Sequence, residues 1–366
     1  MTSEMKKVID AVAGTRRRHS SVPASPKMPA VPILENVSTK PDAPRYARYR
    51  WCDYIELRCL THTDKRFSRD NLAEAIGESK DTTPEDGDDP IDPDIFSLED
   101  HEEPDSGLQK TDDDEALSAA CFRQLRWRSI IFGESWPFDI DHHTQEIKLK
   151  IDLNATHYFY LQLLLSSLLK YCPKKRRNTY TASFEQVSFL VFKDLMPRKS
   201  QVHRFGAAHG TRYKGKLFDK LTLLAQDIRG ELRLERRDFP DSDVGDGGLD
   251  LVAWHDLGDE RDHIPIALGQ CGCTVDGWPD KMLEASPAKL SKKLVTGHDW
   301  STYYFMPLDL TDERDGKMDW QEKRDMATAI VIDRLRLVRL ADAYELMKHG
   351  ALVKPAIDEA LALRIS

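Results

Sequence analysis

Long apolar stretches are missing from this chain of 366 residues. A membrane-spanning helix needs about 20 consecutive apolar residues. The longest apolar run, residues 158–169, is shorter than that and contains a glutamine and two serines. The first residues also lack the apolar core of a secretory signal. We therefore expect a cytoplasmic protein that does not associate with membranes.

Several chemical signatures are missing as well. The six cysteines are scattered and do not form a disulfide framework, and the pair at 271 and 273 has the wrong spacing for a zinc knuckle. The chain contains no phosphate-binding loop, no dinucleotide fingerprint and no Ser/His/Asp order of a hydrolase. These absences argue against a zinc knuckle, the common nucleotide-binding folds and serine hydrolases.

Charge is distributed unevenly along the chain. The net charge is −9, but residues 78–115 hold 17 acids and 2 lysines, whereas residues 1–50 carry a local charge of +6. The remaining residues are therefore close to neutral, and they include the basic run 174–177. Because a neutral enzyme with a local basic patch can bind a phosphate backbone, nucleic acid stays a possible partner.

Composition divides the chain into five parts. Residues 1–50 are rich in Pro, Ser, Arg and Lys and predict a disordered basic tail, and the acidic, proline-containing residues 78–115 predict a disordered linker. Residues 51–77 predict a small ordered segment between them. The remainder is predicted to form an α+β accessory region at 116–180 and an α/β domain at 181–366.

The order of the predicted elements gives the fold class. Alternation at 54–60 predicts a strand, and the apolar run 155–171 predicts a buried helix. The basic run 174–177 is expected to be a loop. From residue 182 onward we predict helices at 182–195 and 214–228, then strands at 231–236, 249–254 and 265–273, followed by alternating helices and strands. This order is typical of an α/β domain with a mixed central sheet flanked by helices.

A glycine-rich hairpin is the most informative stretch. Glycines at 245, 247 and 248 precede the apolar run 249–254, which carries one acid, Asp250, and a second apolar run ends at Gln270 and Cys271. A carboxylate on a half-buried strand costs free energy unless it is paired or binds a cation. Antiparallel pairing would bring Asp250 beside Gln270, whose amide oxygen, with the carbonyl of Cys271, could add ligands for Mg²⁺.

These residues resemble the PD-(D/E)xK nuclease superfamily, also called the restriction-endonuclease-like fold. The resemblance covers residues 182–340 and is strongest at 245–281. It implies a helix with an acid, an Asp on the second strand and an acid-x-Lys on the third. Asp250 is the expected strand acid. Asp219 is the expected helical acid, with Glu185, one helix earlier, as its rival, and the metal held by Asp219 and Asp250 would be Mg²⁺ or Mn²⁺.

The third strand departs from the family pattern. Gln270 stands where the acid is usual and Gly272 where the lysine is usual, so Lys281 from the following helix is the candidate for a lysine that has moved. The resemblance then implies catalysis by Asp250, Gln270 and Lys281, and cleavage of nucleic acid, with DNA as the expected substrate, in bacterial anti-phage defence or restriction. A protein partner such as a helicase fits this setting, whereas the sequence leaves the oligomeric state open.

Two alternatives remain at this point. The chain could be a catalytically inactive nuclease-fold subunit that binds a partner protein or DNA. It could also be an unrelated α/β scaffold in which Asp250 only caps backbone amides at a turn. Spatial clustering of the five candidate side chains would separate these readings.

Overall fold

The computed structural model describes residues 32–41, 48–77, 107–141, 143–205, 212–240, 242–321, 323–326, 328–347 and 353–365. Residues 33–366 form one compact unit. The predicted basic tail and acidic linker lie mostly outside the described residues. Within the described residues, none of the helices combines the length and the apolar character that a membrane crossing requires.

A mixed sheet of five strands forms the centre of this unit. Its order is β12 (Ile330–Ile332), β9 (Ser301–Phe305), β7 (Ile266–Cys271), β6 (Leu251–Trp254) and β4 (Gln201–Arg204). Strands β12, β9 and β7 run parallel, whereas β6 is antiparallel to both β7 and β4. The predicted hairpin is present as β6 and β7, with Leu251 opposite Gly269. The prediction of an α/β region with a mixed central sheet is confirmed.

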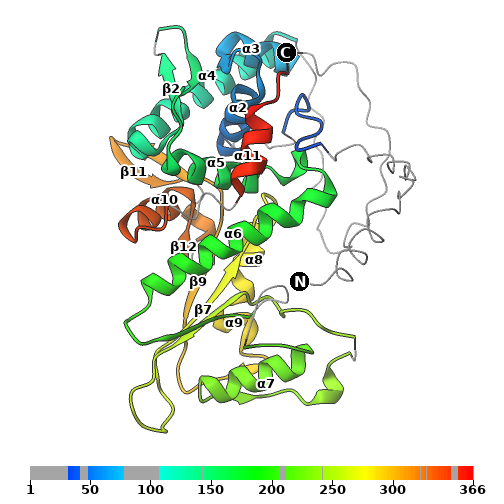
Figure 1. Ribbon diagram of the computed structural model, residues 1–366, viewed down its shortest axis with the longest axis vertical. Helices are drawn as coiled ribbons and strands as arrows, with labels where there is room; N and C mark the ends of the chain where they lie inside the picture. The colour runs from blue at the N-terminus through cyan, green and yellow to red at the C-terminus, as the bar shows by residue number, and fades with distance from the viewer. Residues whose placement is uncertain are drawn as a thin grey trace, which may run out of the picture. The chain divides into compact units, whose positions relative to one another are not determined.

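The two faces of the sheet bury different helices, because side chains alternate along each strand. Leu251, Ala253 and Phe305 belong to the core that includes the apolar side of α6 (Lys174–Leu195), and Figure 1 shows this helix crossing the sheet. Val252 and Leu268 point to the opposite face, where they pack with α7 (Leu217–Asp227). Helix α8 (Trp278–Glu284) covers that same face through contacts with Tyr304.

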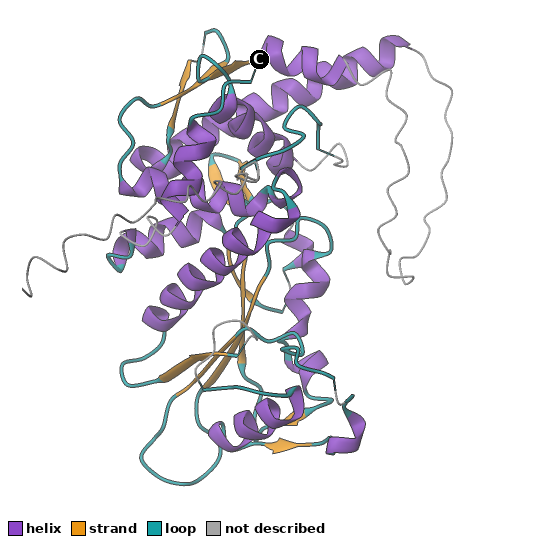
Figure 2. Ribbon diagram, turned by 45° about the vertical axis from the view of Figure 1, so that its right-hand side comes forward, coloured by secondary structure: helices purple, strands orange, loops and turns teal. Residues whose placement is uncertain are grey.

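A mostly helical region lies next to the sheet, as the distribution of helices and strands in Figure 2 shows. Its helices are α2 (Arg48–Thr61), α3 (Arg69–Gly77), α4 (Gly107–Phe132), α5 (Ala155–Ser167), α10 (Arg334–Ala343) and α11 (Lys354–Leu361). A small antiparallel sheet joins them, with β1 (Arg66–Ser68) and β2 (Phe138–Asp141) on either side of β3 (Glu146–Leu149). The remaining short elements are α9 (Pro287–Leu290), the pair β5 (Glu231–Leu232) and β8 (Leu294–Val295), and the hairpin of β10 (Thr311–Arg314) and β11 (Lys317–Trp320).

Buried ion pairs connect this helical region to the sheet. Arg128 of α4 contacts Asp53 and Glu56 of α2 at 2.9 Å each, and Asp309, which follows β9, at 2.7 Å. Arg334, at the start of α10, contacts Asp53 at 2.6 Å. All five side chains are at most 2% exposed. Removing one partner of such a buried network leaves an uncompensated charge, so we expect the network to fix how α2, α4 and α10 meet the sheet.

Three local predictions were wrong. Residues 54–60, predicted as a strand, lie in α2, which is buried on nearly all sides, so its apolar residues do not show a helical period. The basic run 174–177, predicted as a loop, forms the first turn of α6 directly after Pro173. The predicted strand 231–236 is limited to β5, and a short 3-10 helix begins at Arg236.

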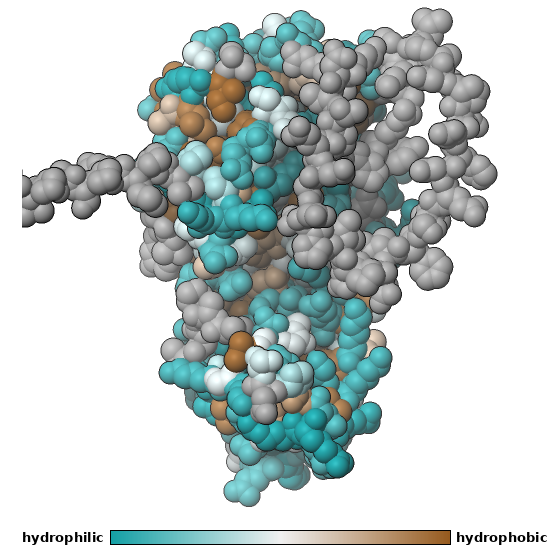
Figure 3. All heavy atoms as spheres, turned by 90° about the vertical axis from the view of Figure 1, so that its right-hand side faces the viewer, coloured by the Kyte–Doolittle hydropathy of each residue, from teal (hydrophilic) through white to brown (hydrophobic). Residues whose placement is uncertain are grey.

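The surface of the described residues is mainly hydrophilic on the face that Figure 3 shows. Large apolar side chains with high exposure are scattered over the fold rather than gathered in one element; they are Ile130, Ile151, Val244, Leu257, Met318 and Ile330. Isolated exposed apolar residues are normal in soluble domains.

Candidate functional site

A glycine turn brings the chain to Asp250. Gly247 and Gly248 have φ values of 65° and 84°, a region that favours glycine. A Cβ atom at Gly248 would lie 2.8 Å from Cβ of Glu284, so a larger residue would push the turn away from α8. The backbone of Asp250 then bonds on both sides, since its N–H donates to Gly269 and its carbonyl accepts from Phe205. The carboxylate is thereby fixed where β6 begins.

Other acids surround the Asp250 carboxyl group. Its Oδ2 accepts a hydrogen bond of 2.8 Å from the backbone N–H of Cys271. Burial raises the pKa of Asp250 to about 8; the Cys271 amide opposes this, and the negative charges of Asp246, Glu185 and Glu284 add to it. A proton or a cation at this point would relieve the repulsion.

Gln270 lies beside one of these acids, Glu284. Its amide Nε2 donates to Oε2 of Glu284 at 3.3 Å, which links the end of β7 to the end of α8. Within the described residues its Oε1 is buried and has no hydrogen-bond partner. A buried amide oxygen without a partner is costly, and a bound cation or water would satisfy it. Gln270 therefore presents an oxygen that suits a hard metal ion.

Position 272 is closed to a lysine. A Cβ atom at Gly272 would lie 2.1 Å from the hydroxyl oxygen of Tyr304, which is itself fully buried. Any side chain there would have to displace Tyr304. Lys281 extends instead from α8 to the β7–α8 loop, where its Nζ donates to Oγ1 of Thr274 at 3.0 Å. Lys281 influences the pKa of the Cys273 thiol, and the acids Glu185 and Asp250 influence the same pKa. Lys281 therefore lies at the margin of the acidic group.

The structure brings Glu185 rather than Asp219 to this group. Glu185 lies on α6, which contacts β4, β6 and β7, and its charge acts on Asp250. Asp219 lies on α7 with a half-exposed carboxylate that pairs with Arg236 at 2.9 Å. It is not among the charges that most affect the pKa of Asp250. Of the two helical acids considered from the sequence, Glu185 has the better placement.

Three charged residues near the site were not found from the sequence. Glu284 follows Lys281 by one helical turn, a spacing that could have indicated it. Asp246 lies in the glycine turn, where acids are common, so its residue type alone does not mark it. Arg204 lies on β4 opposite Leu251, and it is close enough to Glu185 for the two charges to interact. Burial has the largest influence on the Arg204 guanidinium and lowers its pKa. Only strand pairing reveals Arg204, since no local motif marks it.

The donor set fits a hard divalent cation but is not a finished metal cage. Across the parts of the chain that the structure describes, no three His, Cys, Asp or Glu side chains form a ready metal-binding group. The available donors are carboxylate and amide oxygens from Glu185, Asp250, Gln270 and Glu284. Mg²⁺ prefers oxygen ligands and keeps several waters, so it needs few direct protein ligands. The residues therefore fit Mg²⁺ in their chemistry, and a bound ion would have to draw them closer.

Comparisons with known proteins give no relative for this chain. No family model, no curated protein and no solved structure matches it. A functional assignment therefore depends on the arrangement of its own residues.

Proposed function

We propose that this chain is a metal-dependent nuclease of the restriction-endonuclease-like type that cleaves phosphodiester bonds of DNA. One observation carries the proposal: Asp250 at the start of β6 and Gln270 at the end of β7 lie at one end of the sheet, and Glu185 of α6 is near enough for its charge to act on Asp250. Apart from α7, α9 and the short pair β5 and β8, the α-helices and strands from α6 to β9 come in the order helix, three strands, helix and strand, which supports this proposal. Lys281 follows on α8, where a displaced lysine is expected.

Each side chain has a role in this proposal. Asp250, Glu185 and the Oε1 of Gln270 would hold Mg²⁺ or Mn²⁺, and the ion would supply a polarised phosphate and a nucleophilic water when bound. Glu284 holds the Gln270 amide through its Nε2, which leaves the amide oxygen for the metal. Lys281 would neutralise charge at the phosphate, because an ammonium stabilises a developing negative charge.

The test is cleavage by an Asp250→Asn variant. Purified protein with Mg²⁺ or Mn²⁺ is incubated with single-stranded DNA, double-stranded DNA and RNA of one sequence. We expect the wild type to cut DNA and Asp250→Asn to lose at least about a thousandfold in rate, as loss of a metal ligand or of charge stabilisation does. The Asp219→Asn variant is the matched control and should keep the wild-type rate. Equal rates for wild type and Asp250→Asn would refute the assignment.

A second candidate function is a nuclease-fold subunit that binds DNA or a partner protein without cutting. Two observations favour it: Gly272 has no room for the usual lysine, and no ready metal group is found among the described residues. Mn²⁺ titration by calorimetry separates the two, since the inactive subunit should neither bind Mn²⁺ nor cut DNA. A role in anti-phage defence, beside a protein partner such as a helicase, is tested by phage plating on cells that express wild type or Asp250→Asn.

A further inference from the structure

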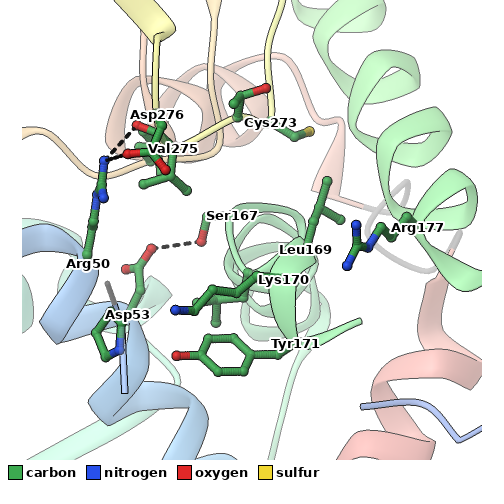
Figure 4. A pocket seen from close by; sticks show the side chains of 14 residues that line it. Arg50, Asp53, Ser167, Leu169, Lys170, Tyr171, Arg177, Cys273, Val275 and Asp276 are labelled. Carbon is green, nitrogen blue, oxygen red and sulfur yellow. Dashed lines mark hydrogen bonds and ion pairs between the residues drawn. The ribbon is translucent and has the colours of Figure 1, made fainter. Parts of the chain in front are cut away.

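A cavity of about 330 Å³ lies between the helical region and the sheet. Its walls come from the start of α2, from the segment that joins α5 to α6, and from the loop between β7 and α8 (Figure 4). Pockets that hold small organic ligands have volumes of about 300–1,000 Å³. The cavity is therefore large enough for a ligand of roughly one nucleotide and too small for a base pair with its backbone.

The cavity borders the acidic group of the candidate site. Cys273 and Thr274 line it, only two and three residues beyond the end of β7. Lys281 bonds to Thr274, and Glu185 and Asp250 are near enough for their charges to act on the Cys273 thiol. A ligand in the cavity would therefore lie close to Glu185 and Asp250 of the acidic group.

Both acids that line the cavity are engaged by arginines. Asp53 contacts the buried Arg334 and Arg128, and Asp276 pairs with Arg50, which also donates to the carbonyl of Val275. Their negative charge is thereby balanced within the protein. The lining acids do not make the cavity a cation site.

Two more cations line the opposite wall. Lys170 donates to the carbonyl of Lys40 at 3.2 Å, and Arg177 donates through Nε to the carbonyl of Cys172 at 3.0 Å. Figure 4 shows both side chains at the cavity, with Leu169 between them and Val275 across from them. A pocket with a cation on each side of an apolar wall suits a ligand with an anionic group and a flat apolar body.

We propose that this cavity holds one unpaired nucleotide of a DNA strand, next to the phosphate that the acidic group would cut. This inference rests on the proposed nuclease function and adds the substrate class: single-stranded DNA, or a duplex whose end has opened. The base would lie against Leu169 and Val275, its phosphate would contact Arg177, and the ammonium of Lys170 would lie on the other side of Leu169. Proteins usually hold single strands by cations that contact the nucleic-acid backbone, together with contacts to the bases. Enzymes that take a base out of a duplex must supply the free energy of unpairing it.

The experiment measures binding without cleavage. A fluorescent twelve-nucleotide dT strand and a blunt twelve-base-pair duplex are titrated with full-length protein in EDTA at fixed salt. We expect the wild type to bind the strand at least about tenfold more tightly than the duplex. Arg177→Ala and the cavity-filling Leu169→Trp should each weaken strand binding about tenfold, whereas Arg177→Lys should recover part of it.

A matched control and a second ligand sharpen the result. Lys175→Ala removes an exposed cation from the same helical turn outside the cavity, so it should leave the preference for the strand unchanged. Equal binding of strand and duplex, or wild-type binding by both Arg177→Ala and Leu169→Trp, would overturn the proposal. Free dTMP that binds as tightly as the strand would also overturn it, because the cavity would then serve a free nucleotide.

Failure of the nuclease assignment can be told apart from failure of this inference. Asp250→Asn lies outside the cavity lining and should bind the strand at least as well as the wild type in EDTA. If the wild type does not cut DNA but keeps the strand preference and its loss in Arg177→Ala, the proposed catalysis fails and the nucleotide cavity stands. If the wild type cuts DNA but binds strand and duplex equally well, the nuclease assignment stands and the nucleotide cavity fails.

Discussion

Two carboxylates in this protein, Asp53 and Asp250, have pKa values that are shifted in opposite directions. In the buried network, burial acts to raise the pKa of Asp53, but Arg334 and Arg128 outweigh it and the pKa is lowered. At the end of the sheet, burial raises the pKa of Asp250 to about 8, and the nearby acids push it in the same direction. Arginines of the fold keep the Asp53 carboxylate ionised. No positively charged side chain is among the strongest influences on the pKa of Asp250.

This difference separates a structural role from a functional one. Charges that the protein neutralises itself connect elements and have no need of a ligand. A carboxylate held among other acids is destabilising until a proton or a cation binds, and such residues concentrate in functional sites. We therefore propose the end of the sheet as the place for a metal ion, whereas the network around Asp53 joins the helical region to the sheet.

The largest expected effect is on the free energy of unfolding, through the buried network around Asp53. Replacing Arg128 with Met leaves Asp53, Glu56 and Asp309 buried with Arg334 as the remaining arginine of the network. Breaking a buried ion pair by removing one partner costs about 3–5 kcal/mol. Urea denaturation should show this loss in the free energy of unfolding. As a control, Arg261→Met removes an exposed ion pair and should leave the denaturation midpoint unchanged. Equal midpoints for Arg128→Met and wild type would remove the distinction between Asp53 and Asp250.

The next effect concerns the helical acid. Glu185→Gln should lower the rate of DNA cleavage about a hundredfold, which corresponds to about 2.7 kcal/mol in the activation free energy. Asp219→Asn should change the rate less than about twofold, because Asp219 pairs with Arg236 at the surface. Rates are measured with saturating Mg²⁺ under single-turnover conditions. If Asp219→Asn proves to be the slow variant, the metal lies nearer α7 than we propose.

The smallest effect is on the pH dependence of stability. The pKa of Asp250 is raised from 3.8 to about 8 in the folded protein. Between these values the folded state holds a proton that the unfolded chain releases, so this contribution to stability is present at low pH and is lost as pH rises through the window. In EDTA, Asp250→Asn should therefore be more stable than wild type at pH 8, by about 1–3 kcal/mol, and nearly equal at pH 4.

Addition of metal should reverse that order. Mg²⁺ or Mn²⁺ that binds the folded state raises the stability of the wild type by mass action, and the variant lacks the ligand. Thermal melting at pH 8 with and without Mn²⁺ gives the comparison. A wild type that gains nothing from Mn²⁺, together with an Asp250→Asn variant that is no more stable in EDTA, would show that Asp250 is an ordinary structural carboxylate.

Local sequence predicted the central part of the fold well. The glycine turn and two apolar runs gave the β6–β7 hairpin, and Asp250 and Gln270 could be named because antiparallel strands bring such positions together. The same reasoning failed at 54–60, since a helix buried on nearly all sides loses its amphipathic period. The choice between Glu185 and Asp219 could not be made locally, because both are acids on helices that precede the hairpin.

The sequence by itself predicted the β6–β7 hairpin and the glycine turn before Asp250, since these depend on residue type and local spacing. Position 272 is closed by Tyr304 of β9, a contact that only the tertiary structure shows. Tertiary structure alone decided which acids are matched by arginines. Arg128 reaches Asp309 and Arg334 reaches Asp53 across 181 and 281 residues of chain. Coulomb interactions depend on distance in space and on burial, and neither follows from separation along the chain.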